Sequence, residues 1–139
     1  MAMKKSHMDL VNDARTRIKT ISIDEAKEMY GKDDVVFVDL RDVRELDREG
    51  MIVGAEHAPR GMLEFWVDPE SPYHREVFSS GKTFVFYCAS GWRSSLATDA
   101  VRAMGLESVC HIGEGFAGWR DAGGAVGERR QKKKPEEKK

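Results

Sequence analysis

Cysteine is scarce in this chain of 139 residues, and long hydrophobic runs are missing. The two cysteines, Cys88 and Cys110, are too few for a disulfide framework, and no Cys/His set has zinc-ligand spacing, so we expect reduced thiols, no metal and no cofactor. No apolar stretch approaches the roughly 20 residues of a membrane-spanning helix. The first residues include two lysines but no apolar segment after them, which argues against a signal peptide. These absences favour a cytoplasmic protein that does not bind membranes.

A strong net charge is also missing, because the whole chain carries −1, but the charge is unevenly distributed. Residues 128–139 hold seven Lys or Arg and three Glu, which leaves 16 basic against 21 acidic residues before them. This acidic body argues against a nucleic-acid-binding domain. We interpret residues 127–139 as a disordered, solvated tail, with contact to RNA or a membrane surface as the alternative.

The chain does contain a regular alternation of strand-like and helix-like segments. Apolar runs predict buried strands at 35–38, 83–87 and 108–112, with shorter strands at 18–21 and just before Pro59. Capping boxes, terminal glycines and apolar spacing predict helical segments at 23–30, 42–49, 61–67, 73–79, 94–104 and 116–122. The alternation indicates one α/β domain, at 16–126, with a mostly parallel sheet. Residues 1–15 are polar and unpatterned, so we expect a flexible N-terminal arm.

Cys88 is the residue whose surroundings in the sequence most clearly indicate chemical reactivity. It follows the predicted strand at 83–87, and small residues, a glycine and a helix follow it. Ligands of parallel α/β sheets bind beyond the carboxyl ends of the strands. A tight loop that opens into a helix presents backbone N–H groups and a positive dipole end to an anion. Together with the charge of Arg93, these effects favour the thiolate, so we interpret Cys88 as a reactive nucleophile and not as an inert buried thiol.

The other candidate groups have less distinctive surroundings. Cys110 lies in the middle of a strand, so we interpret it as a packing residue, with a disulfide to Cys88 as the alternative. Asp39 ends another strand, and an unpaired carboxylate there would oppose a nearby thiolate, so Asp39 should have a partner. The four histidines are scattered along the sequence, and we interpret each as a structural or surface residue.

Five segments, in this order, resemble the single-domain sulfurtransferases of the rhodanese family. They cover about residues 18–126 and are Asp39-Leu40-Arg41 with Glu45, Gly50 to Ala55, His57-Ala58-Pro59, Tyr87 to Ser94, and Gly113 to Phe116 with Trp119. Met51 departs from the family pattern, which often has histidine there. The resemblance implies a three-layer fold in which helices flank a central, mostly parallel five-stranded sheet.

The resemblance also implies a reaction. A sulfane-sulfur donor, such as thiosulfate or a persulfide, would transfer one sulfur to Cys88, and the enzyme persulfide would pass it to cyanide, a thiol or an acceptor protein. The implied substrate-binding residues are Ala89, Ser90, Gly91, Trp92 and Arg93, and the implied loop-support residues are Asp39, Arg41 and Ser94. We expect a monomer.

Two roles stay open from the sequence alone. Arg93 either orients an anionic donor or forms a structural ion pair, for which Asp39 is a candidate partner. Trp92 either caps the substrate pocket or is simply an exposed loop aromatic.

Two rival functions are considered beside sulfur transfer. Phosphatases and arsenate reductases of similar fold have arginine six positions after the cysteine, whereas here Ser94 occupies that position and Arg93 comes one residue earlier. The shorter loop favours a single sulfur over a tetrahedral oxyanion. The second rival is a partner-binding module that carries sulfur with little free turnover.

Overall fold

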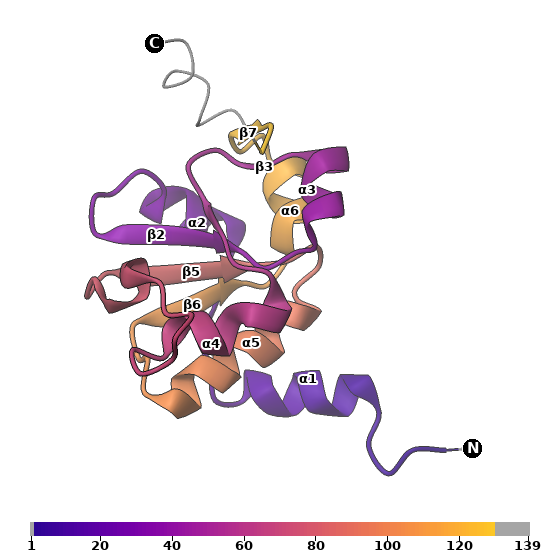
Figure 1. The fold of residues 1–139 in the computed structure, drawn as a ribbon. Coiled ribbons are helices and arrows are strands. Elements are labelled where there is room, and N and C mark those ends of the chain that lie inside the picture. The colour runs from indigo at the N-terminus through magenta and orange to yellow at the C-terminus, as the bar shows by residue number, and fades with distance from the viewer. Residues whose placement is uncertain (1, 130–139) are drawn as a thin grey trace.

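The computed structural model describes residues 2–129, and its centre is a five-stranded sheet (Figure 1). The strand order is β1-β6-β5-β2-β4, and all neighbouring strands run parallel. The strands are β1 (Thr20–Ile21), β2 (Val35–Asp39), β4 (Glu56–His57), β5 (Thr83–Tyr87) and β6 (Val109–Ile112). The predicted α/β class with a parallel five-stranded sheet is confirmed.

Helices form the layers on the two sides of the sheet (Figure 1). One layer contains α2 (Ile23–Met29), α3 (Val43–Glu49) and α6 (Gly115–Asp121). The other contains α4 (Leu63–Val67) and α5 (Trp92–Met104). Two 3-10 helices, η1 (Arg60–Met62) and η2 (Glu76–Ser79), pack against α4.

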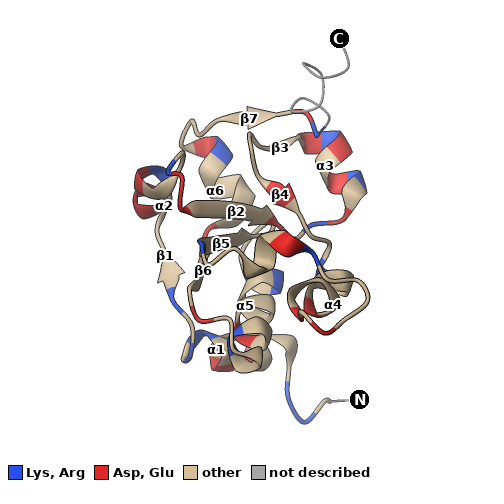
Figure 2. Cartoon of the chain, turned by 60° about the vertical axis from the view of Figure 1, so that its left-hand side comes forward, with Lys and Arg blue, Asp and Glu red and all other residues tan. Residues whose placement is uncertain are grey.

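The central strands are buried on both faces, which gives two hydrophobic clusters. Val85 and Tyr87 of β5 face the α2, α3 and α6 layer, whereas Phe84 and Phe86 face α4 and α5. All four side chains are fully buried. The strands β2, β5 and β6 contain one residue of the types Asp, Glu, Lys and Arg, which is Asp39, and most other residues of these types lie on the helices and loops (Figure 2). Double-sided burial explains why these strands are continuous apolar runs in the sequence.

The predicted helix boundaries depend on caps, and the structure contains them. At the start of α2, the Glu25 N–H donates to Ser22 Oγ at 3.1 Å, and the Ser22 N–H donates to the Glu25 carboxylate at 2.9 Å. Gly50 and Gly105 end α3 and α5 with φ angles of 80° and 113°. These positive angles favour glycine, so the two helices stop where the sequence predicts.

The N-terminal segment differs from the expected unpatterned arm. Residues His7–Arg15 form α1, which starts at a capping box on Ser6 and packs on α5. Its buried side chains are Val11 and Ala14. Two small apolar residues in a polar segment make a weak periodic pattern, so the contact with α5, and not local sequence, identifies this helix.

The second sheet is also absent from the sequence prediction. Strands β3 (Met51–Ile52) and β7 (Val126–Gly127) pair in antiparallel fashion beside α3. Next to β7, Arg129 forms an ion pair with Asp47 of α3 at 2.8 Å. The remaining residues of the predicted tail, 130–139, lie outside the described residues. Within residues 2–129, no helix has both the length and the apolar character needed to cross a bilayer.

Candidate active site

The candidate nucleophile and the candidate carboxylate meet at one edge of the sheet. Strands β2 and β5 are adjacent, and their register pairs Asp39 with Tyr87. The chain leaves both strands at the same level, where the Leu40 N–H donates to the Tyr87 carbonyl at 2.9 Å. Cys88 follows directly, at the carboxyl ends of the strands, which is where ligands of such sheets bind. We call residues 88–93 the Cys88 loop.

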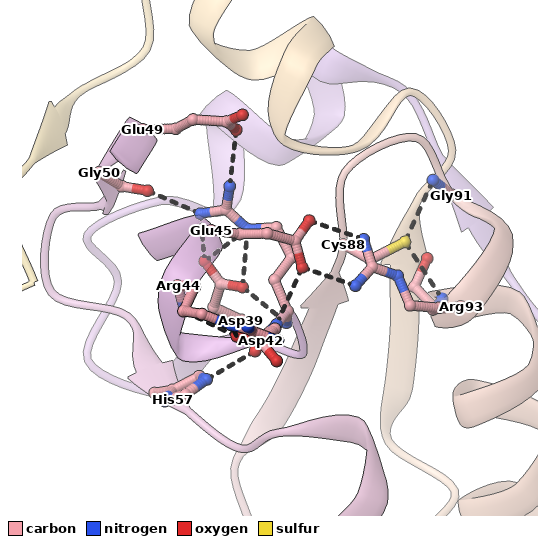
Figure 3. A network of polar contacts seen from close by, with 12 residues as sticks. Asp39, Asp42, Arg44, Glu45, Glu49, Gly50, His57, Cys88, Gly91 and Arg93 are labelled. Carbon is pink, nitrogen blue, oxygen red and sulfur yellow. Dashed lines mark hydrogen bonds and ion pairs between the residues drawn. The ribbon is translucent and has the colours of Figure 1, made fainter. Parts of the chain in front are cut away.

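Two backbone N–H groups point at the Cys88 sulfur. The Gly91 and Ser94 N–H groups donate to Sγ, with N···S distances of 3.2 and 3.3 Å (Figure 3). Both lie at the N-terminus of α5, which adds the positive end of a 13-residue helix dipole. Cys88 is 1% exposed, so little water competes with these donors. This pair of N–H groups, which we call the amide cradle, favours an anionic sulfur at Cys88.

Two glycines let the chain pack closely around the loop. Gly91 has a φ of 98°, and a Cβ there would overlap a neighbouring carbonyl oxygen. Gly115, at the start of α6, has a φ of 67°, and its Cβ would overlap the Ala89 carbonyl. This close approach allows the Phe116 N–H to donate to the Cys88 carbonyl at 2.8 Å. The loop is therefore bound by α5 on one side and α6 on the other.

The arginine of the loop is paired with a carboxylate of α3. Arg93 Nη1 and Nη2 donate to the two Glu45 oxygens at 2.8 and 3.0 Å (Figure 3). This pair raises the pKa of Arg93 and lowers the pKa of Glu45. Glu45 also accepts the Asp42 N–H at 3.0 Å and so completes the capping box of α3. The sequence suggested Asp39 as the ion-pair partner of Arg93. This prediction was wrong, because the Asp39 carboxylate binds Arg41.

Asp39 has the cationic partner that its position requires. Arg41 Nη2 and Nε donate to Asp39 Oδ2 and Oδ1 at 2.8 and 3.0 Å, and both side chains are 0% exposed. The same guanidinium donates to the Gly50 carbonyl at 2.7 Å and lies 4.1 Å from the centre of the Phe116 ring. The pair therefore connects the end of β2 to the end of α3 and to α6.

The solvent-facing side of the Cys88 loop is formed by Ser90 and Trp92. Trp92 is 48% exposed, and its ring centre lies 5.0 Å from that of His7 in α1. Ser90 is exposed, whereas Ala89 is half-buried and its carbonyl accepts the Ala117 N–H at 3.2 Å. Ser90 and Trp92, together with the Arg93 side chain, which is 41% exposed, are therefore the parts of the loop that solvent reaches.

A buried histidine supports the amide cradle from the sheet. The two ring nitrogens of His111, in β6, lie 2.8 Å from Ser94 Oγ and 2.8 Å from Thr20 Oγ1. Burial, with a smaller contribution from the Arg15 charge, lowers the pKa of His111 to about 4. The neutral ring therefore holds Ser94, whose N–H is one of the two donors to Cys88.

We expect acid to destabilise the fold through His111. The pKa is lowered from 6.5 to about 4 on folding, so the folded state binds this proton less readily than the unfolded chain. The free energy of unfolding therefore does not change through His111 above the pKa of the unfolded chain, 6.5. It falls as the pH drops from there toward 4, and the full loss is roughly 3 kcal/mol. Urea unfolding of the wild type and of His111→Gln, measured between these limits, should show a shallower pH dependence for the variant. The exposed His7→Gln control should keep the wild-type dependence, and equal slopes in all three proteins would contradict this prediction.

The second cysteine differs from the first. Cys110 is buried in β6, and burial raises the pKa of its thiol to about 11, so it stays protonated near neutral pH. Both cysteines are free thiols in the structure. Among the residues that the structure describes, no three His, Cys, Asp or Glu side chains are grouped so that they could hold a metal ion.

Three residues at the site were not among the predicted site residues: Glu45, His111 and Arg15. The spacing of Glu45 from Asp42 marks it as a capping residue but does not reveal its bond to Arg93. His111 and Arg15 have no local pattern, because their partners at the start of α5 are distant in the sequence.

Comparisons with known proteins agree with this architecture. The family model of the rhodanese-like domain matches residues 22–122. A solved structure from Rhodopseudomonas palustris, described as a protein of unknown function and "possible tyrosine phosphatase", is 44% identical with a TM-score of 0.86, and the match covers 91% of this chain and 98% of that one. A human single-domain sulfurtransferase is 25% identical with a TM-score of 0.61, covering 73% and 95% of the two chains. Mouse thiosulfate sulfurtransferase/rhodanese-like domain-containing protein 3 is 26% identical over 106 residues, which are 73% of this chain and 68% of that protein.

Proposed function

The chain belongs to the rhodanese-like domain family, and from this premise we propose that it is a sulfurtransferase that carries sulfane sulfur on Cys88 as a persulfide. The observation that carries the proposal is the amide cradle, in which two N–H groups at the start of α5 donate to one buried sulfur. A thiolate and a persulfide are both anions, so the same donors stabilise the enzyme before and after sulfur is loaded.

The reaction has two displacement steps. The Cys88 thiolate attacks the outer sulfur of a donor such as thiosulfate, the donor S–S bond breaks, and sulfite leaves with the electron pair. A nucleophilic acceptor, such as cyanide or a thiolate, then attacks the terminal sulfur of the persulfide. The second S–S bond breaks, the acceptor keeps the sulfur, and the Cys88 thiolate is restored with no net redox change.

The remaining loop residues take supporting roles in this proposal. Ala89, Ser90 and Gly91 provide the backbone wall of the substrate site, and Trp92 covers its outer side. Arg93 is bound to Glu45 on two sides, so we assign it first to holding the loop against α3 and only second to attracting an anionic donor. Asp39, Arg41 and Ser94 support the loop without touching substrate.

A tyrosine phosphatase is the second candidate, because the similar Rhodopseudomonas palustris protein is described in those words. A cysteine phosphatase needs an arginine whose guanidinium is free to donate hydrogen bonds to the phosphoryl oxygens. Here the loop arginine comes five residues after Cys88, and Glu45 already occupies both ends of its guanidinium. Ser94 takes the following position and directs its hydroxyl to His111. These contacts favour sulfur over phosphate.

Intact-mass spectrometry after incubation with thiosulfate tests the proposal. We expect a gain of one sulfur atom on the wild type, its loss on addition of cyanide or a thiol, and no gain on Cys88→Ala. The same proteins should not hydrolyse an aryl phosphate, and phosphatase activity that depends on Cys88 would overturn the assignment. A stable persulfide without turnover on any small acceptor would instead identify a module that delivers sulfur to a partner protein.

A further inference from the structure

Helix α1 contacts the Cys88 loop although it lies outside the residues that match the family. The match begins at residue 22, whereas α1 covers His7–Arg15. The ring of its first residue, His7, lies at a tilted angle against that of Trp92, and its last residue, Arg15, reaches the start of α5. Both ends of α1 therefore contact the segment that follows Cys88.

Arg15 binds the residue whose N–H forms half of the amide cradle. Its Nη2 donates to the Gly91 carbonyl at 3.3 Å, and its Nε donates to Ser95 Oγ at 2.9 Å. Ser95 in turn donates to the Gly91 carbonyl through its hydroxyl at 2.6 Å and its backbone N–H at 3.2 Å. Three donors thus converge on the carbonyl of Gly91, whose own N–H donates to Cys88 Sγ. Gly91 has a φ of 98°, so these contacts hold a residue whose backbone is otherwise free to turn.

Arg15 also brings a positive charge that forms no ion pair with a carboxylate among residues 2–129. The charge of Arg93 is matched by Glu45, whereas the ion pairs within residues 2–129 include none that involves Arg15. Its partners are the neutral oxygens of Gly91 and Ser95. The influence of this charge extends to the buried ring of His111, which binds Ser94. Arg15 therefore places a positive charge next to Gly91, whose N–H donates to Cys88 Sγ.

We propose that Arg15 is a positioning residue of the active site, which fixes Gly91, the residue whose N–H is part of the amide cradle, and adds a positive charge beside it. In this proposal α1 helps to form the active site through Arg15. The inference deepens the proposed sulfur transfer and rests on it for the turnover measurement. Its other measurement, the reactivity of Cys88 toward an alkylating agent, does not depend on sulfur transfer.

The test compares Arg15→Met with Arg17→Met. Arg17 is a matched control, because it also joins the N-terminal segment to α5, through Asp99, but does not touch the Cys88 loop. We expect the pH profile of Cys88 alkylation by iodoacetamide to move to higher pH in Arg15→Met and to stay unchanged in Arg17→Met. Loss of hydrogen bonds that orient a charged group predicts a fall in kcat/KM for sulfur transfer of about tenfold, mainly in kcat. Arg15→Lys keeps the charge and should restore most of the alkylation profile.

Two outcomes would overturn the role of Arg15. One is an unchanged alkylation profile in a folded Arg15→Met protein, with folding checked by circular dichroism. The other is an equal change in Arg15→Met and Arg17→Met, which would mean that either arginine acts only by holding α1. If the wild type transfers no sulfur, the proposed function fails, but the alkylation profiles still decide the role of Arg15.

Discussion

Sulfur transfer by Cys88→Ala is expected to fall by about three orders of magnitude or more, because the variant has no atom that can carry the sulfur. The expected loss is in kcat, since the loop amides and Trp92 remain to bind a donor. The measurement is thiocyanate formation from thiosulfate and cyanide, with protein pure enough that contaminating sulfurtransferase contributes less than the residual rate.

Cys110→Ala is the matched control for this prediction. Cys110 is the other buried cysteine, and its thiol stays protonated near neutral pH and lies in the core. This variant should keep sulfur transfer near the wild-type rate, with a modest loss of stability from the missing sulfur atom. Retention of activity in Cys88→Ala, or loss of activity in Cys110→Ala, would show that the reaction does not take place on Cys88 in the amide cradle.

The largest expected effect on stability comes from Arg41→Met. Arg41 and Asp39 are both 0% exposed, and removal of the cation leaves the Asp39 carboxylate buried without its charge partner. Breaking a buried pair from one side costs about 3–5 kcal/mol, since the remaining charge has neither water nor a counter-ion. Urea unfolding monitored by tryptophan fluorescence measures the loss.

Two further variants identify the cause of that loss. The double variant Asp39→Asn with Arg41→Met removes the charge but keeps a side-chain oxygen for the backbone N–H of residue 41, which donates to Asp39 at 3.0 Å. It should therefore be more stable than Arg41→Met alone. Arg44→Met breaks the exposed pair with Asp42, whose side chains are 82% and 49% exposed, and should change stability by less than about 0.5 kcal/mol. A double variant as unstable as the single one would show that lost packing, and not the unpaired charge, is responsible.

Helix α3 connects these two predictions. Its first turn provides Glu45 to Arg93, and its last residues provide Glu49 and the Gly50 carbonyl to Arg41. One short helix thus binds both Arg93, within the Cys88 loop, and Arg41, outside it. We infer that α3 sets the position of the loop relative to β2.

The sequence by itself determined the central sheet, most of the helices and the place of the proposed nucleophile at the end of a strand. Strands β2, β5 and β6 were predictable because double-sided burial requires continuous apolar runs, and α2 and α3 because their caps are local motifs. The position of Cys88 between a strand, a glycine-bearing loop and a helix was likewise a local pattern. Such features depend on residues only a few positions apart, so one stretch of sequence contains all the information for each.

Only the tertiary structure decided which partners surround the sulfur. Arg93 binds Glu45, which lies 48 positions away, and Arg15 binds Ser95, which lies 80 positions away. Helix α1 was missed because two small buried residues are a weak pattern until α5 lies against them, and β7 was missed because its partner strand, β3, lies far from it in the sequence, with Ile52 opposite Val126. A side chain chooses among distant partners by where folding places them, and the spacing of residues along the sequence does not contain that information.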